Sequence, residues 1–214
     1  MCDVSGVQDY VEGNIRRLSD YNIKPFHTIH LMVLLYEIPQ HFNHVIFDLF
    51  WGYPAACKRD FLDASCLVFH GKTYRDVVDY CHYMFLNATA TNKSIWHSGD
   101  VMDDVNRIGH HTIDVCLKDL PASVTHLFFT LSAWQSPTIA HYPNPSLKFF
   151  EASDKSKDLC NTSFQHACHS QAVIMCSVER RGGQWKIFNC GKLSAGNAMN
   201  YEPLISTIQS LISA

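Results

Sequence analysis

Short apolar runs separated by turn residues fill most of the sequence, and they limit the folds open to it. The runs occupy residues 29–38, 44–51, 63–70, 111–117, 124–134, 146–152, 171–180 and 184–192. Several are rich in β-branched and aromatic residues, which favours strands. Arg181-Gly182-Gly183 joins the last two runs, as is typical of a β-hairpin. The segment 71–99 is compatible with either a strand or a short helix.

Helical patterns are confined to the two ends of the chain. Apolar residues recur every three or four positions over residues 7–19, which predicts an amphipathic helix. A second such pattern begins beside Pro203 and predicts a C-terminal helix over 201–212. Many short strands with one helix at each end predict a mainly β fold, an antiparallel two-sheet β-sandwich with short N- and C-terminal helices. We expect a helical extension over residues 1–28 and one sandwich domain over 29–214.

The composition indicates a compact globular protein and excludes several classes of partner. The chain has 214 residues, of which 47% are hydrophobic and 17% charged. A formal net charge of -3 without basic clusters predicts no nucleic-acid partner and no membrane-surface partner. No apolar run approaches the roughly 20 residues of a membrane span, and no secretory signal is apparent. We therefore expect a soluble cytoplasmic protein whose nine scattered cysteines are reduced.

One polar stretch, residues 95–117, is the strongest candidate for a binding site. It contains Asp100, Asp103, Asp104, Asn106, His110, His111 and Asp114. Crowded carboxylates repel one another unless a cation lies among them, and a hard cation with oxygen ligands suits them best. A solvated acidic turn is the alternative, and the spacing is not that of an EF-hand. Asp63, at the start of another apolar run, could bring a further carboxylate to the same place.

Several motifs follow one another in a distinctive order. They are HVIFDLFW at 44–51, DFLDAS at 60–65, HSGD at 97–100, IDVCLKDLPASVTHLFFTLS at 113–132, and AVIMCSVERRGGQWKIFNCGKLSAGN at 172–197. In order and spacing this series resembles the TerD family of tellurium-resistance and stress proteins. The combination of HSGD with the LPxxV step is the most specific part of the resemblance, which extends over about residues 29–214. The resemblance implies a two-sheet β-sandwich with a stress-related role.

The resemblance also implies a calcium site, formed by carboxylates of a DLDAS strand and of the loop after HSGD. The DLDAS aspartate nearest the serine corresponds to Asp63, and the HSGD aspartate corresponds to Asp100. The earlier DLDAS aspartate falls on Phe61, unless neighbouring Asp60 substitutes by a shift of one residue. The family's loop closes with Asp-Asp-Glu. In this sequence those positions are Gly109, His110 and His111.

This departure leaves three outcomes open for the site. Calcium could bind through Asp63, Asp100, Asp103, Asp104 and Asn106. Zinc or another transition metal could bind a mixed site that includes His110 and His111, because imidazole suits such metals better than calcium. The chain could also have lost the metal and kept the domain as a scaffold for a protein partner. Metal binding requires Asp63, Asp100 and the Asp103-Asp104 pair to meet at one end of the sandwich.

Other candidate chemistry is less specific. His166, Cys168 and His169 lie close together with Cys160 upstream, and we interpret this cluster as structural. The sequence lacks the motifs of common nucleophilic, nucleotide-dependent and zinc-dependent enzymes, so we predict that the protein is not an enzyme. A thiol hypothesis remains open, in which an exposed cysteine of depressed pKa reacts with oxyanions such as tellurite.

Overall fold

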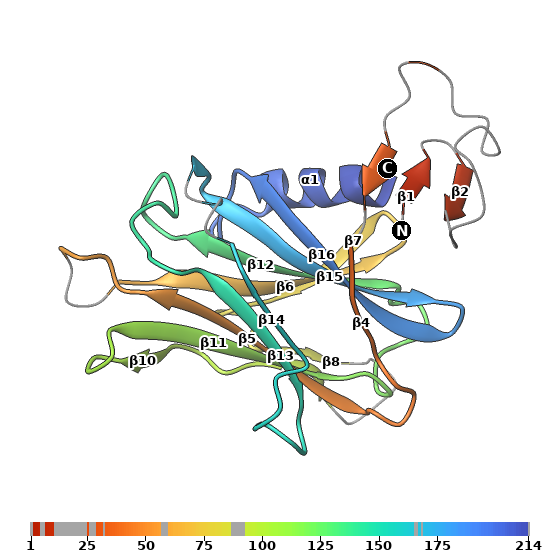
Figure 1. Cartoon of the computed structure of the whole chain (residues 1–214), viewed down its shortest axis with the longest axis horizontal. Coiled ribbons are helices and arrows are strands. Elements are labelled where there is room, and N and C mark those ends of the chain that lie inside the picture. The colour runs from red at the N-terminus through yellow and green to blue at the C-terminus, as the bar shows by residue number, and fades with distance from the viewer. Residues whose placement is uncertain are drawn as a thin grey trace.

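Two antiparallel sheets stacked face to face form the body of the molecule (Figure 1). The structure is a computed structural model. It describes residues 2–4, 7–10, 25, 29–31, 33–56, 60–86, 93–164, 167 and 169–213. The predicted antiparallel β-sandwich is confirmed.

The first sheet, here called the β5–β11 sheet, has the order β14-β13-β5-β11-β9-β8, and β10 pairs with β11 outside that order. Its strands are β5 (His44–Gly52), β8 (Met84–Leu86), β9 (Lys93–His97), β10 (Val101–Asp103), β11 (Ile108–Cys116), β13 (Ser146–Glu151) and β14 (Cys160–Ser163). The second sheet, the β6–β15 sheet, has the order β4-β16-β15-β12-β6-β7. Its strands are β4 (Val33–Glu37), β6 (Leu62–His70), β7 (Thr73–Val78), β12 (His126–Ala133), β15 (Ala172–Arg181) and β16 (Gln184–Ser194).

The facing sides of the two sheets supply the main hydrophobic core. Phe47 of β5 stacks on Phe129 of β12, with ring centroids 3.8 Å apart. Along β11, buried and partly exposed residues alternate strictly, because only one face of that strand meets the core. β6 and β15 are buried on both faces, since a helix covers the outer side of their sheet.

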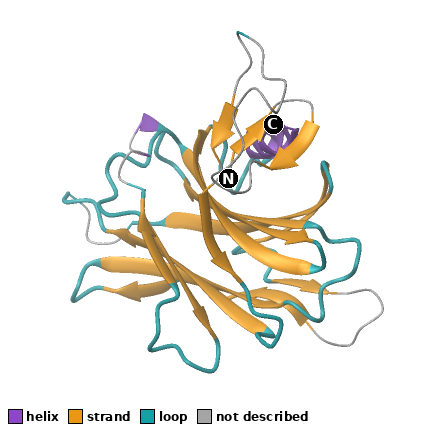
Figure 2. Ribbon diagram, turned by 45° about the vertical axis from the view of Figure 1, so that its right-hand side comes forward, coloured by secondary structure: helices purple, strands orange, loops and turns teal. Residues whose placement is uncertain are grey.

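That helix is α1 (Glu202–Ser213), and it confirms the predicted C-terminal helix. Figure 1 shows it along the outer side of the β6–β15 sheet, and in Figure 2 it is the purple helix beside the label C. Leu204 and Ile208 are fully buried there and form a second hydrophobic cluster with Leu67, Phe128 and Ile174. Burying a side chain of this size stabilises a fold by roughly 1.5–3 kcal/mol.

The hairpin predicted at Gly182-Gly183 is also present, between β15 and β16. Both glycines have positive φ angles, 58° and 80°. Other residues rarely adopt this backbone region, so the dipeptide sets the turn. The segment 71–99 contributes β7, β8 and β9, which decides for strands among its described residues.

The helix predicted over residues 7–19 is wrong at its start. β2 (Val7–Tyr10) is a strand that pairs with β1 (Cys2–Val4), and β1 also pairs with β3 (Ile29–Leu31). Pairing with β1 outweighs the weak helical periodicity of a segment that Gly13 already disfavours as helix. The remainder of that prediction, 11–19, lies outside the described residues. Among those described, no helix combines the length and the apolar character needed to cross a membrane.

Candidate functional site

The candidate ligand residues do not gather at a single point, and the structure divides them into three groups. Asp63, Asp100 and His111 lie together at the end of the sandwich where β6 begins. Asp103, Asp104 and Asn106 belong to the β10–β11 turn. His110 lies on the outer face of the β5–β11 sheet.

The central contact of the first group joins His111 and Asp100. His111 is fully buried in β11, and its Nε2 lies 2.7 Å from Oδ1 of Asp100. The backbone N–H of Ala64 donates to Nδ1 of the same ring at 3.1 Å. A ring nitrogen that accepts a hydrogen bond carries no proton, so Nε2 is the nitrogen that donates to Asp100. His111 is therefore a neutral imidazole with both nitrogens in use.

A second neutral imidazole, His97, packs against the first. Its ring centroid lies 4.6 Å from that of His111. The N–H of Gly99 donates to Nδ1 of His97 at 2.9 Å, and Nε2 donates to the carbonyl oxygen of Ala64 at 3.2 Å. Burial, and then the neighbouring His111, lower the pKa of His97 to about 4. Both backbone groups of Ala64 are thus held by imidazoles.

Asp63 is the buried carboxyl of this group. It is 7% exposed, and its Oδ2 is enclosed without a hydrogen-bond partner among the described residues. Burial, and then the charges of Asp100 and Asp79, raise the pKa of Asp63 to about 7. The cause is physical, because a carboxylate that loses water and faces two others keeps its proton more readily. Asp63 therefore needs either a proton or a cation near neutral pH.

The second group closes the β10–β11 turn. Oδ1 of Asp103 accepts from the backbone N–H groups of Val105 and Asn106, at 3.0 Å and 2.9 Å. The side-chain amide of Asn106 donates to Oδ2 at 2.6 Å. These hydrogen bonds lower the pKa of Asp103. Oδ1 of Asp104 accepts from the hydroxyl of Tyr53 at 2.9 Å. The turn carboxylates are thus engaged separately from Asp63 and Asp100.

The third group contains His110, whose neighbour in the chain points the other way. Successive residues of a strand face opposite sides of the sheet, so His110 points outward where His111 points into the core. Nδ1 of His110 lies 2.6 Å from Oδ1 of Asp48, and its ring stacks on Phe50 with centroids 4.8 Å apart. The two histidines are therefore unable to bind one metal ion together.

Comparison with known proteins places this arrangement in a family. The TerD domain matches residues 33–200. The chain belongs to the TerD domain family. This confirms the resemblance that the motifs carry, and it covers most of the sandwich. The comparison with curated proteins gives no match.

Two solved structures share the fold of this TerD domain. The crystal structure of a protein of unknown function, SAV2460, has a TM-score of 0.57 and 15% identity, and the match covers 78% of this chain and 98% of that one. A homologue of telluride resistance protein (TerD), SCO6318 from Streptomyces coelicolor A3(2), has a TM-score of 0.57 and 14% identity, over 76% and 96% of the two chains. At such identities the likeness shows the fold alone.

The donor set of this TerD domain fits a divalent cation poorly. Asp100 already accepts from an imidazole N–H, and the ring nitrogens of His97 and His111 are occupied. Within the described ranges, no group of three or more His, Cys, Asp or Glu side chains is arranged to hold a metal ion.

The position of the first acid in the family's loop has no room for a side chain. It is Gly109, which pairs across the strands with Trp51. A Cβ atom at Gly109 would lie 2.5 Å from the Trp51 ring, far inside van der Waals contact. Trp51 is fully buried and its indole N–H donates to the carbonyl of Asp60 at 3.1 Å, so the ring is held in place. The indole fills the space that an aspartate side chain would need.

Sequence reasoning missed three residues of this site. His97 belongs to the HSGD motif, and its histidine was available as a signal. Asp79 and Tyr201 come from distant parts of the chain. The Tyr201 hydroxyl donates to Oδ2 of Asp79 at 2.8 Å and lies 2.7 Å from Oγ of Ser65. These two contacts of the Tyr201 hydroxyl connect the start of α1 to the site, and no local sequence pattern predicts them.

The cysteine candidates find little support. Burial raises the pKa of five thiols, at Cys66, Cys116, Cys160, Cys176 and Cys190. A raised pKa disfavours the reactive thiolate. Cys81 is exposed. His166 and Cys168 of the proposed His/Cys cluster lie outside the described residues.

Proposed function

We propose that this TerD domain is a non-enzymatic, tellurium-resistance-like stress domain that acts in the cytoplasm as a metal-free scaffold for a protein partner. Family membership supports the stress-related role. One observation carries the metal-free form: both ring nitrogens of His111 are used within the protein, one by Asp100 and one by Ala64. The imidazole stands where the family's loop has its last acid.

The imidazole links the two elements that a bound cation would link. A cation would fasten the loop after HSGD to the start of β6 by attracting carboxylates from both. Here the neutral imidazole of His111 contacts both elements, because it donates to the Asp100 carboxylate and accepts from the backbone N–H of Ala64. A hydrogen bond to a charged group contributes roughly 1.5–3 kcal/mol net. We therefore expect the folded domain to need no metal.

A second candidate function, divalent-cation binding, rests on Asp63. Its buried Oδ2 has no partner in the described part of the chain, and Asp100 lies near enough to raise its pKa. Calcium takes six to eight oxygen ligands, roughly, so two carboxylates would leave most positions to water and backbone. Such a site would be weak. Zinc is less suited, because His110 faces the opposite side of the sheet from His111.

Thermal unfolding in chelator, calcium and zinc separates the two candidates. A ligand that binds only the folded state adds about 2.7 kcal/mol at a hundredfold excess over Kd. The scaffold predicts equal midpoints in EDTA, calcium chloride and zinc chloride. A calcium-dependent rise that Asp63→Asn abolishes and Asp103→Asn leaves intact would establish the cation site instead.

The variant His111→Glu serves as a positive control for this experiment. It restores a carboxylate near Asp63 and Asp100 and removes the imidazole that donates to Asp100. We expect it to unfold at lower temperature in EDTA and to recover stability on adding calcium. A response in His111→Glu together with no response in the natural sequence would show that the histidine replaces the cation.

A further inference from the structure

A cavity lies at the other end of the sandwich from Asp63. Asp63 pairs with Ser132 on β12, and Ser132 pairs with Ala172 at the start of β15. Arg180 lies eight residues further along β15, which corresponds to about 26 Å at 3.3 Å per residue. The cavity beside Arg180 has a volume of about 350 Å³. Ligand pockets begin at about 300 Å³, so it can hold a small molecule.

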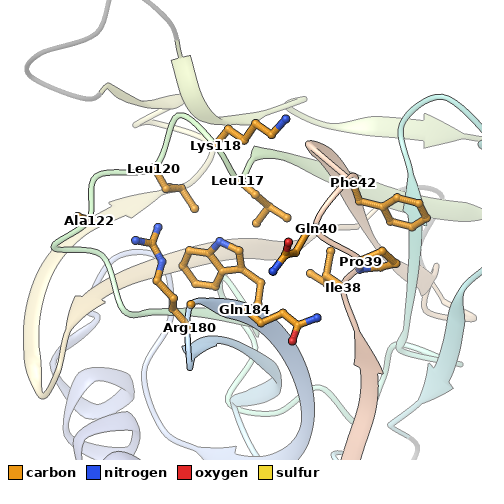
Figure 3. Close-up of a pocket in the computed structure, with 12 residues that line it drawn as sticks. Ile38, Pro39, Gln40, Phe42, Leu117, Lys118, Leu120, Ala122, Arg180 and Gln184 are labelled. Carbon is orange, nitrogen blue, oxygen red and sulfur yellow. The ribbon is translucent and has the colours of Figure 1, made fainter.

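Three segments enclose this cavity (Figure 3). They are the turn over residues 38–42 that follows β4, the loop over residues 117–122, and the β15–β16 hairpin. Ile38, Leu117 and Leu120 are almost fully buried and give it an apolar floor. The N–H of Ile38 donates to the carbonyl of Trp185 at 2.9 Å, which fixes two of the walls together. The site is therefore built from the rigid body of the fold.

Two cations line the cavity, and within the described residues neither forms an ion pair. The Arg180 guanidinium lies over the Trp185 ring, 4.6 Å from its centroid. Figure 3 shows Leu117 and Leu120 between Lys118 and the Arg180 guanidinium. Among the described residues, neither Arg180 nor Lys118 forms an ion pair or a side-chain hydrogen bond. Burial lowers the pKa of Arg180, as expected for a charge partly removed from water.

Two carboxylates that neighbour lining residues along the strands, Glu179 and Glu37, are engaged elsewhere. Glu179 precedes Arg180, faces the other side of the sheet and accepts from Nε of Arg181 at 2.7 Å. Glu37 precedes Ile38 and lies 3.6 Å from Nζ of Lys186. The residues that line the cavity include no acid, and their remaining polar side chains are two amides, Gln40 and Gln184. The cavity combines positive charge, amide groups and an apolar floor.

We propose that this cavity binds a small organic carboxylate with an apolar body, whose anionic group meets Arg180 while its apolar part packs on Trp185 and the leucines, with Lys118 adding positive charge on the far side of the leucines. A guanidinium presents paired N–H donors that match a carboxylate, and the indole beneath Arg180 already orients it. An anion there would bring opposite charge to Arg180, which forms no ion pair within the described residues. This site is independent of the His111 network and of the proposed scaffold role.

A matched pair of probes tests the proposal on the full chain. The probes are 4-phenylbutyrate and its neutral amide, 4-phenylbutanamide, which share size and shape and differ in charge. Two-dimensional NMR of the indole N–H groups reports binding at Trp185, and Trp185→Phe assigns that signal. We expect a saturable shift at Trp185 with the carboxylate, at an affinity about tenfold or more above that of the amide.

Three variants locate the anion. Arg180→Met roughly keeps the length of the side chain and removes its charge. It should lower the affinity for the carboxylate about tenfold, to the affinity for the amide. Lys118→Met, in an exposed loop position, should weaken it less, about threefold. Lys192→Met removes one charge at the distant end of β16 and should change nothing. Unchanged signals from Trp51, Trp96 and Trp134 show that each variant is folded.

Either of two results overturns the proposal. One is the lack of a saturable Trp185 shift with the carboxylate up to about 10 mM, a concentration at which even weak binding is visible. The other is a failure to recognise the charge, shown by equal affinity for carboxylate and amide or by an Arg180→Met variant that binds the carboxylate as the natural sequence does. Either would leave the cavity as an ordinary surface hollow.

Discussion

The two ends of the sandwich differ in the sign of their charged side chains and in how those side chains are paired. At the Asp63 end, the exposed carboxylate of Asp100 accepts from His111 and the buried carboxylate of Asp79 accepts from Tyr201, while Oδ2 of buried Asp63 has no hydrogen-bond partner among the described residues. At the Arg180 end, two cations line an open cavity, and within the described residues no carboxylate answers them. The first arrangement is closed and holds the fold together. The second is open and suits a ligand. The stabilising network and the proposed binding cavity are thus about one strand length apart in the same domain.

The closed end supplies the largest expected effect. His111→Ala would leave Asp100 and the buried N–H of Ala64 without their imidazole partner, and it would open a cavity beside Trp51. We expect the free energy of unfolding to fall by about 3 to 5 kcal/mol. Urea denaturation at neutral pH measures it.

His110→Ala is the matched control for this prediction. It removes the neighbouring imidazole, which is partly exposed on the outer face, and it should cost about 1 kcal/mol. Equal losses in the two variants would show that the closed network contributes nothing special to stability. The statement that the network at the Asp63 end stabilises the fold would then be wrong.

The second prediction concerns pH, and two groups act in opposite directions. Burial raises the pKa of Asp63 in the folded state to about 7 from an ordinary value of 3.8, so the folded state holds the extra proton and stability falls as pH rises through that range. His97 has a folded pKa of about 4 against 6.5, so the unfolded state holds the extra proton and stability falls as pH drops from 6.5. Between about pH 4 and 6.5 the two effects largely offset each other.

Asp63→Asn isolates the two effects. The variant keeps the shape of the side chain and removes its titration, so only the His97 effect remains. Stability should then rise with pH up to about 6.5 by as much as 1.4 kcal/mol per pH unit, and it should exceed that of the natural sequence above pH 7. Urea midpoints from pH 5 to 8 test this. Parallel curves for variant and natural sequence would contradict the buried, proton-holding role of Asp63.

Much of the fold was predictable because its signals are local. The alternation of core and surface residues, the Gly182-Gly183 turn and the apolar face of the last helix all depend on residues close together in sequence. The helix expected over 7–19 failed where pairing with β1 decides the structure. β1 lies only a few residues before β2, but it also pairs with β3 at Ile29–Leu31, and a short periodic pattern does not contain that distant pairing.

The site was predicted only in part, for a related reason. Asp63, Asp100 and His111 were found as candidates and do lie together. Their hydrogen-bonding roles were harder to predict from the sequence, because they depend on which bonds each ring nitrogen makes to the backbone of a different strand. One step was within reach: β11 begins at Ile108, so His110 and His111 lie on opposite faces, and strand alternation alone separates them.

The smallest expected effect belongs to the open end. A cation that meets only solvent and an indole adds little to folding, so Lys118→Met should change the free energy of unfolding by about 0.5 kcal/mol or less. Arg180→Met should cost somewhat more, about 1 kcal/mol, because it also loses its contact with the Trp185 ring. Urea denaturation of both variants beside His111→Ala measures the contrast. A loss at the open end as large as that at the closed end would mean that Arg180 is a structural residue. Small losses, together with weaker binding of the carboxylate probe, would show that its charge is kept for a ligand.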